Sequence, residues 1–296
     1  MAGPSPLTKL DDDRLAEAGV ELYLKRDDLI GAEITGNKWR KLRYNLDAAR
    51  EQGHGTLLTF GGAYSGHIRA VAAAGHRFGF ATIGVIRGEE HLPLNDSLAF
   101  AVSRGMQLTY LARTAYRAKA SPQVIDGLRA EFWPFYLLPE GGSNALAVRG
   151  CAEIAAEIAA QLPPGAAGPA DLVCCPCGTG GTLAGLAAGL RPGQRVLGFA
   201  VLRGASFLDD EVARLQREAL GAPTANWSVS HDFHCGGYAR RTPELEAFIA
   251  DFQRRHAIRL ERVYVAKMMR GIFALAQRPA IVPGTRVVAV ITGPAV

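Results

Sequence analysis

The chain has 296 residues, of which 48% are hydrophobic and 21% are charged, as in an ordinary globular protein with room for a sizeable core. Residues Met1 to Leu10 lack a basic start followed by an apolar run, and no uninterrupted apolar stretch reaches the length of a membrane span. These features exclude a membrane-spanning protein and predict a soluble protein of the cytoplasm.

The net charge of +5 comes from basic residues that are scattered along the sequence and interleaved with acids. Nucleic-acid-binding proteins usually gather such residues on one stripe, so we expect no nucleic-acid partner. Three of the five cysteines, Cys174, Cys175 and Cys177, are crowded together, and no second cluster stands at metal-ligand spacing. We therefore expect free thiols in a reducing compartment and no metal site.

Short apolar runs alternate along the chain with segments of helical period, which predicts an α/β fold with parallel sheets covered by helices on both faces. The spacing of apolar residues predicts helices over Trp39–Gln52 and Asn144–Gln161. The apolar runs predicted to be buried strands are Thr56–Phe60, Phe80–Ile86, Met106–Leu111, Phe135–Leu138, Asp171–Cys175, Arg195–Ala200 and Arg286–Ile291.

Two Gly/Pro-rich segments, Pro139–Asn144 and Leu162–Ala170, mark candidate domain boundaries. Several predicted strands and their helices lie before the first of them, which suggests a smaller α/β domain inserted into a larger one. We expect residues 1–45 and 145–296 to form the larger domain and residues 46–144 the inserted one. The two motifs described next would then face the cleft between these domains.

The first motif, Ile34–Leu42, places Lys38 at a turn that opens a helix. The amine of such a lysine can hold an aldehyde cofactor as a Schiff base. Taken alone, Lys38 is better explained as a surface lysine of an amphipathic helix, because Arg40, Lys41 and Arg43 are close to it in the sequence.

The second motif, Cys177–Gly185, is rich in glycine and stands between a predicted strand and a helix. Glycines let backbone N–H groups turn toward an anion at the start of a helix, where the helix dipole favours negative charge. A dinucleotide fingerprint would need glycine in place of Leu183 and an acid after the strand Val196–Val201, and a P-loop would need a lysine. A tight turn without a ligand is the other alternative. An amine and a phosphate cradle together suggest pyridoxal phosphate.

Six short motifs follow one another along nearly the whole chain: Lys25–Asp28, Gly36–Leu42, Gly61–His67, Pro139–Asn144, Gly178–Thr182 and Val263–Tyr264. Their order and content resemble the 1-aminocyclopropane-1-carboxylate deaminase and D-cysteine desulfhydrase family. The resemblance implies a pyridoxal phosphate enzyme of the tryptophan synthase β-like fold, also called fold type II. It also implies two open twisted parallel-sheet domains with the cofactor in the cleft between them, and a homodimer.

The resemblance assigns roles to individual residues. Lys38 matches the Schiff-base lysine of the family, the glycine-rich loop matches its phosphate loop, and a C-terminal threonine matches one near the pyridine nitrogen. The residues expected to hold the cofactor are Lys38, Gly178, Thr179, Gly180, Gly181, Thr182 and Thr292.

The substrate is expected to meet a second set of residues. Ser65, Gly66 and His67 match the family's substrate-binding segment, although His67 is at least as well explained as a structural histidine. Tyr238 and Tyr264 match tyrosines that are candidates for proton transfer. The catalytic residues expected from the resemblance are therefore Lys38, Ser65, Tyr238 and Tyr264.

The sequence departs from the family pattern at four places. Gly66 replaces an asparagine, and Val265 stands where the deaminases carry glutamate and the desulfhydrases threonine. Ile291 replaces a histidine, and Pro294 replaces a glycine. These departures bear on the substrate and on whether catalysis is retained.

The resemblance implies a hydrolase or lyase that deaminates a small amino acid, as 1-aminocyclopropane-1-carboxylate deaminase does, with release of ammonia and a 2-oxo acid. The alternative within the family is β-elimination of sulfide from D-cysteine. A protein that binds pyridoxal phosphate without catalysis, and a nucleotide-dependent oxidoreductase, are the alternatives from other classes.

Overall fold

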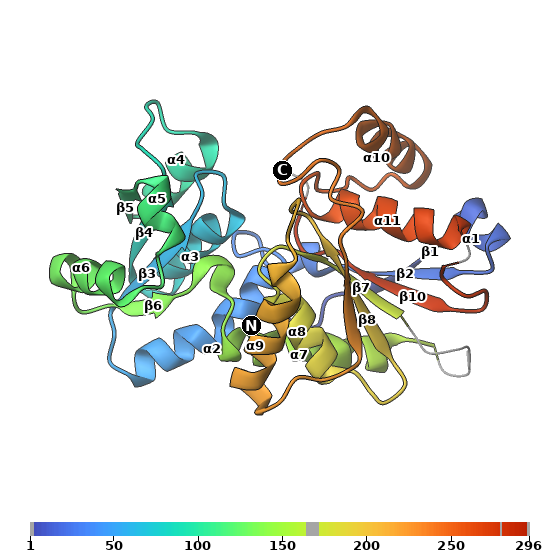
Figure 1. Cartoon of the computed structure of the whole chain (residues 1–296), viewed down its shortest axis with the longest axis horizontal. Coiled ribbons are helices and arrows are strands. Elements are labelled where there is room, and N and C mark those ends of the chain that lie inside the picture. The colour runs from blue at the N-terminus through green and yellow to red at the C-terminus, as the bar shows by residue number, and fades with distance from the viewer. Residues whose placement is uncertain (1–2, 164–171, 279, 295–296) are drawn as a thin grey trace. The chain divides into compact units, whose positions relative to one another are not determined.

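The computed structural model describes residues 3–163, 172–278 and 280–294 (Figure 1). In this part of the chain the fold is α/β, as predicted, and it divides into two compact units. The larger unit combines the chain up to Arg40 with the chain from Asn144 onward, and the smaller unit is Lys41–Ser143. Most of the predicted linker Leu162–Ala170 lies outside the described residues. None of the described helices is long and apolar enough to cross a membrane.

The described residues of the larger unit form a six-stranded sheet. Neighbouring strands are parallel, except that the edge strand β1 is antiparallel to β2. The register places Val288 beside both Tyr23 and Val173 at the centre of the sheet. In spatial order the strands are β1 (Leu7–Leu10), β2 (Glu21–Lys25), β10 (Arg286–Val290), β7 (Leu172–Cys177), β8 (Arg195–Ala200) and β9 (Trp227–Ser230).

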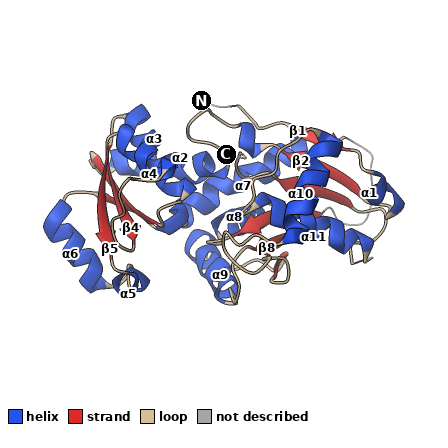
Figure 2. Cartoon of the chain, turned by 90° about the horizontal axis from the view of Figure 1, so that it is seen from above, coloured by secondary structure: helices blue, strands red, loops and turns tan. Residues whose placement is uncertain are grey.

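Helices cover both faces of this sheet (Figure 2). Side chains alternate between the two faces along each strand, so a strand made of apolar residues presents an apolar surface on both sides. Val287 and Ala289 of β10 belong to one hydrophobic cluster, while Val288 and Val290 belong to the other. The first cluster includes side chains of α1 (Asp13–Glu17), α10 (Pro243–His256) and α11 (Val265–Gln277). The second includes side chains of α7 (Ala145–Gln161), α8 (Gly181–Gly189) and α9 (Phe207–Leu220).

The described residues of the smaller unit form a four-stranded sheet in which all pairs are parallel. Leu58 and Phe60 pack with residues of α5 (Arg113–Arg117) and α6 (Pro122–Phe132), while Thr59 points to the other face and contacts α3 (Gly66–Phe78). Helix α4 (Asp96–Ser103) packs beside α3. In spatial order the strands are β5 (Met106–Leu111), β4 (Ala81–Arg87), β3 (Thr56–Gly61) and β6 (Tyr136–Leu138), and the short helix η2 (Glu140–Gly142) follows β6.

A buried group of charges fixes the start of α2 (Asn37–Glu51) in the larger unit. The Arg40 guanidinium donates to Asp27 Oδ1 of the short helix η1 (Asp27–Leu29) and to Glu157 Oε2 of α7, both at 2.9 Å. Lys25 Nζ lies 2.6 Å from Glu157 Oε2, and Ser5 Oγ donates to Asp27 Oδ1 at 2.6 Å. Two cations and two carboxylates therefore balance one another in the interior, where an unpaired charge would be costly.

Asp12 holds a second cluster that links α1 to α10. Its carboxylate caps α1 by accepting from Arg14 N at 3.0 Å, and it lies 2.6 Å from an Arg14 guanidinium nitrogen and 2.9 Å from His256 Nε2. Burial opposes ionisation, but the hydrogen bonds from Arg14 and His256 outweigh it and lower the pKa of Asp12 from 3.8 to about 2. The ionised form is therefore favoured in the folded protein.

Substitution of Asp12 by asparagine is expected to remove a pH-dependent part of the stability. Because the pKa of Asp12 is lower in the folded state, its carboxylate stabilises the fold above about pH 4 and loses this contribution as the pH falls toward 2. We expect about 1 kcal/mol, since the partly exposed Arg14 and Asp251 leave the cluster screened by water. Urea titrations of the wild type and of Asp12→Asn from pH 6 to pH 2 measure the difference in free energy of unfolding. A difference that does not vary with pH would contradict the prediction.

Candidate functional site

The helix that carries Lys38 begins against the chain that follows β10. Gly36 has a φ of 64°, and a Cβ added to it would lie 2.0 Å from the carbonyl oxygen of Thr292. Asn37 N donates to the same carbonyl at 3.1 Å. Only glycine permits this close approach, so the turn before Lys38 is fixed beside Thr292. The structure thus brings together two residues that the sequence analysis assigned to the cofactor.

Asn37 connects the amine of Lys38 to the glycine-rich loop. Its Oδ1 accepts from Lys38 Nζ at 3.0 Å, and its Nδ2 donates to Thr182 Oγ1 at 2.9 Å. Asn37 and Thr182 are only 6% and 4% exposed, so the contact between them is shielded from water. The sequence analysis gave Asn37 no role, because the contact depends on a residue far along the chain.

The glycine-rich loop leaves β7 and opens α8. Gly180 is the N-cap of α8 with a φ of 74°, and a Cβ on it would lie 2.9 Å from Val212 Cγ2. Among the described residues no side-chain hydrogen bond caps this end of α8. Gly181 N donates to Thr179 O at 2.9 Å, and the next amide, that of Thr182, lies in the first turn of α8, where backbone N–H groups are suited to an anion. Backbone donors beside a primary amine fit the phosphate and the aldehyde of pyridoxal phosphate, so the residues present suit that cofactor.

Tyr264 lies against Gly178 of the glycine-rich loop, and Tyr238 lies against Tyr264. A Cβ added to Gly178 would lie 3.0 Å from Tyr264 Cε1, so the tyrosine ring packs on the loop backbone. The rings of Tyr264 and Tyr238 meet edge to face, with centroids 5.9 Å apart and an interplanar angle of 76°. Glu261 fixes the start of α11 by accepting from the backbone nitrogens of Tyr264 at 2.7 Å and Val265 at 3.2 Å. Glu261 is a second residue that the sequence analysis did not identify.

Two of the departures from the family pattern are core positions. Val265 is fully buried and belongs to the hydrophobic cluster of α10 and α11, and Ile291 is 2% exposed in the same cluster. The backbone of Ile291 accepts from Asp28 N at 2.9 Å, which ties the end of β10 to η1. Neither side chain offers a polar group for catalysis.

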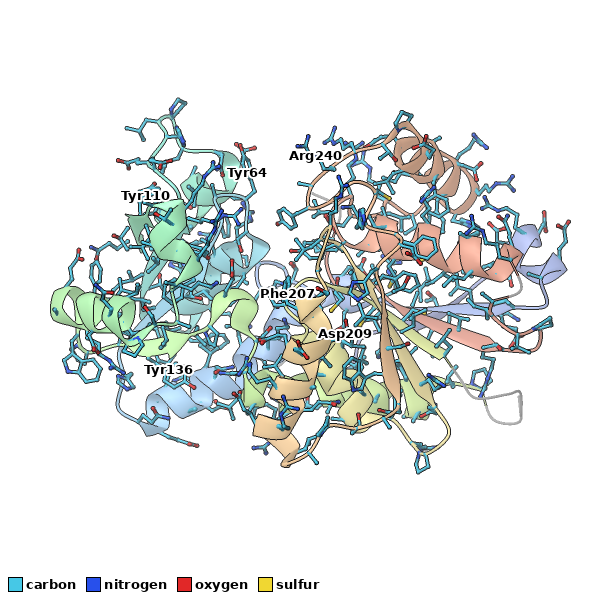
Figure 3. The ribbon with its side chains drawn as sticks, in the orientation of Figure 1. Tyr64, Tyr110, Tyr136, Phe207, Asp209 and Arg240 are labelled. Carbon is cyan, nitrogen blue, oxygen red and sulfur yellow. The ribbon has the colours of Figure 1, made fainter. Side chains whose placement is uncertain are left out.

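Ser65, Gly66 and His67 lie in the smaller unit, at the start of α3. Ser65 is the N-cap of α3 and accepts from His67 N at 3.2 Å, while Tyr64 before it is 75% exposed (Figure 3). His67 is buried, with Nε2 2.8 Å from Thr59 Oγ1, so it has a structural contact and its role toward substrate stays a prediction. Around Gly66, no atom lies within 4 Å of an added Cβ, so a side chain fits there.

The described residues contain no group of three or more His, Cys, Asp or Glu side chains that could hold a metal ion. Cys174, Cys175 and Cys177 are buried and are not part of a disulfide. Burial raises the pKa of the Cys174 thiol, which keeps it protonated and unreactive. The cysteines near the glycine-rich loop are thus core residues of β7.

Substitution of Gly36 by alanine is expected to weaken cofactor binding at least about 10-fold and to destabilise the protein by about 2 kcal/mol or more, through the left-handed conformation and the overlap with Thr292 O. Gly53, just after the other end of α2, also has a positive φ, but no atom lies within 4 Å of an added Cβ. Gly53→Ala is the matched control and should show only the conformational cost. Cofactor titration and urea denaturation measure both effects, and equal losses in the two variants would contradict the explanation.

Comparisons with known proteins place the chain among characterised families. The model of the pyridoxal-phosphate dependent enzyme family matches residues 1–293. A Pyrococcus horikoshii protein with the provisional name 1-aminocyclopropane-1-carboxylate deaminase is 31% identical over 284 residues, which cover 94% of this chain and 85% of the relative. The D-cysteine desulfhydrase of Yersinia pestis is 30% identical over 290 residues, covering 92% of this chain and 86% of the relative.

Comparison with solved structures points to the same group of proteins. A solved structure described as an ACC deaminase homologue superposes with a TM-score of 0.82 at 29% identity, covering 98% of this chain and 89% of the other. The predicted fold type and cofactor are therefore confirmed. The chain belongs to the family of pyridoxal-phosphate dependent enzymes, and within it to the group that contains 1-aminocyclopropane-1-carboxylate deaminases and D-cysteine desulfhydrases.

Proposed function

We propose that the chain deaminates a small amino acid to a 2-oxo acid and ammonia, with 1-aminocyclopropane-1-carboxylate as the first candidate substrate. The observation that carries the proposal is the continuous contact from Lys38 Nζ through Asn37 to Thr182 at the open start of α8. This contact supports the proposal because it links a primary amine to a helix start within one unit, and a helix start favours an anion. The names of the relatives supply the substrate class.

In this proposal the cofactor's phosphate is held by the backbone N–H groups of Gly178–Thr182, and its aldehyde is bound by Lys38. The hydroxyl of Thr292 is the proposed hydrogen-bonding partner of the ring nitrogen. When bound, pyridoxal phosphate supplies an electron sink for negative charge that develops on the substrate. The protein fixes the orientation of the reacting groups and controls their protons.

Protons are handled by groups at the edge of the same site. Lys38, once displaced by the amino group of the substrate, carries a proton at Nζ, and the Asn37 amide oxygen keeps this nitrogen in place. Tyr264, whose ring lies against Gly178, and Tyr238 beside it are the proposed phenolic proton donors or acceptors. Ser65 is proposed to hold the substrate at the start of α3, where a helix N-terminus favours a carboxylate. Water then completes the release of ammonia.

Elimination of sulfide from D-cysteine is the second candidate, because D-cysteine desulfhydrase of Yersinia pestis is among the relatives. The position after Tyr264 does not separate the candidates, since the buried Val265 is neither the glutamate of the deaminases nor the threonine of the desulfhydrases. In this alternative Cα loses a proton, the Cβ–S bond breaks with release of sulfide, and hydrolysis of the remaining enamine gives pyruvate and ammonia. The same lysine and cofactor cradle serve both reactions.

A panel assay separates the candidates. The purified protein with cofactor is incubated with 1-aminocyclopropane-1-carboxylate and with D- and L-cysteine and D- and L-serine, and ammonia, sulfide and 2-oxo acids are measured, with Lys38→Ala as the blank. Ammonia and 2-oxobutanoate from the cyclopropane substrate support the first candidate, and sulfide with pyruvate supports the second. A lysine-bound cofactor without turnover of any of these amino acids would contradict both and indicate a binding protein.

Gly66→Asn tests the most exposed departure from the family. The variant restores the amide that relatives place near the cofactor, and the structure has room for it. An unchanged substrate profile in this variant would show that Gly66 does not set the reaction.

We also propose a homodimer located in the cytoplasm. None of the cysteines within the described residues is in a disulfide, which supports a reducing compartment, and the family resemblance supports the dimer. Light scattering should give about twice the chain mass of 31.5 kDa.

A further inference from the structure

Lys267 on α11 is a lysine with no exposed surface. Burial lowers the pKa of its ammonium, and among the described residues no carboxylate forms an ion pair with it. Instead Nζ donates to two backbone carbonyls, at 2.6 Å to Gly237 and at 3.3 Å to Val201, which follows β8. A buried amine costs free energy unless its hydrogen bonds are made, so these two carbonyls account for its presence.

The loop that receives this hydrogen bond has an unfavourable backbone. Cys235, Gly236, Gly237 and Ala239 have φ values of 49°, 86°, 123° and 54°. Non-glycine residues rarely adopt such angles, and they persist only where surrounding contacts hold them. Gly236 N donates to His234 Nδ1 at 3.0 Å within the loop, while Lys267 ties the loop to β8 and α11.

The residue after Gly237 is Tyr238, one of the two tyrosines of the proposed site. Tyr238 is 41% exposed, so packing alone does not fix its side chain. Arg240, two residues later, is exposed as well (Figure 3). The ring of Tyr238 meets that of Tyr264, which is the N-cap of α11 and lies three residues before Lys267. One helix therefore carries one tyrosine and, through the Lys267 ammonium, holds the loop that carries the other.

We propose that Lys267 is a positioning residue that fixes Tyr238 against Tyr264 through the Gly237 carbonyl. A hydrogen bond from an ammonium is stronger than one from a neutral donor, and here it links the loop to two elements of the sheet and helix framework. The part of this proposal that concerns turnover rests on the proposed function, whereas the anchoring of the loop does not.

A double-mutant cycle on the cofactor-loaded protein tests the effect on turnover. Lys267→Met and Tyr238→Phe are each expected to lower kcat about 10-fold or more, and the double variant should be little slower than either single variant, because both act through one phenol. Arg14→Met is the control, since Arg14 is a partly buried cation that links α1 to α10 through Asp12 and Asp251, and none of these residues is assigned to the site. It should lower the urea midpoint and leave kcat near that of the wild type. Losses that multiply in the double variant, or a wild-type kcat in Lys267→Met, would overturn the proposal.

Hydrogen exchange of the cofactor-free protein tests the anchoring without any activity. The amides of residues 236–240 should exchange at least about 10-fold faster in Lys267→Met than in the wild type or in Arg14→Met. Equal exchange rates would overturn the anchoring.

If the wild type turns over no amino acid, the proposed function fails and the exchange rates alone decide this inference. If Tyr238→Phe is fully active, the role of Tyr238 fails and the turnover part of this inference fails with it.

Discussion

Substitution of Lys38 by alanine is expected to remove the visible absorption band of the lysine-bound cofactor and to lower turnover by at least about 10²- to 10⁴-fold. The reason is structural as well as chemical. Lys38 Nζ is held by Asn37, which also holds Thr182 at the start of α8, so the amine and the anion-binding amides form one arrangement. Absorbance spectra and ammonia release measure the two effects.

Lys38→Arg and Lys9→Ala are the controls for this prediction. Arginine keeps a positive charge at position 38 but cannot form the covalent link, so it should fail in the same way as alanine. Lys9 is exposed and pairs with Glu21, neither of which is assigned to the site, and its removal should change neither the spectrum nor the rate. A visible band and normal turnover in Lys38→Ala would refute the assignment.

Substitution of Arg40 by methionine is expected to destabilise the protein by about 3 to 5 kcal/mol. Arg40 is 5% exposed and contacts the carboxylates of both Asp27 and Glu157. Although burial disfavours its charge, the hydrogen bonds with these acids raise the pKa of Arg40. Without it, the buried carboxylate of Asp27 and the partly buried carboxylate of Glu157 are left with Lys25 as their cation. Urea denaturation measures the loss.

Arg214→Met is the matched control for Arg40. Arg214 also contacts two acids, Glu211 and Glu218 on its own helix, but its side chain is 45% exposed. Because water screens this cluster, its loss should cost less than about 1 kcal/mol. Arg40→Lys should recover only part of the stability, since an ammonium cannot bridge both carboxylates as the guanidinium does. A similar cost for Arg40→Met and Arg214→Met would contradict the argument.

The network around Arg40 also bears on function. Arg40 lies two residues after Lys38, and its contacts with η1 and α7 hold the first turn of α2 in place. A variant that loosens this turn is expected to lower cofactor affinity along with stability. The motif Lys25–Asp28, which marked the family resemblance, is thus explained by packing: Lys25 and Asp27 join the network, while Arg26 pairs with Asp28.

Much of the fold was predictable because buried strands of a parallel sheet are continuous apolar runs. The predicted strands over Thr56–Phe60, Met106–Leu111 and Arg195–Ala200 agree with β3, β5 and β8 within a residue. Strands β1, β2 and β9 were not predicted, because polar or charged residues interrupt or flank each of them and leave no long continuous apolar run. β2 also ends in a charged residue, Lys25, whose burial depends on Glu157 of a distant helix.

The candidate site was predictable where a local motif carries the chemistry. Gly180 could be expected to open a helix toward an anion because glycine allows the left-handed angle that the structure shows. The roles of Asn37 and Lys267 could not be expected, since each depends on one atom of a partner brought near by folding, Thr182 Oγ1 and the Gly237 carbonyl. Sequence spacing carries no record of such contacts.

The central claim is that pyridoxal phosphate is bound covalently to Lys38, and one measurement tests it directly. The cofactor-loaded protein is reduced with borohydride, digested, and mapped by mass spectrometry. The chain has six lysines, Lys9, Lys25, Lys38, Lys41, Lys119 and Lys267, so the peptides are easily told apart. The pyridoxyl group is predicted on Lys38 alone at one per chain. Its presence on Lys41 or Lys267 in place of Lys38, or on none of the six, would contradict the account.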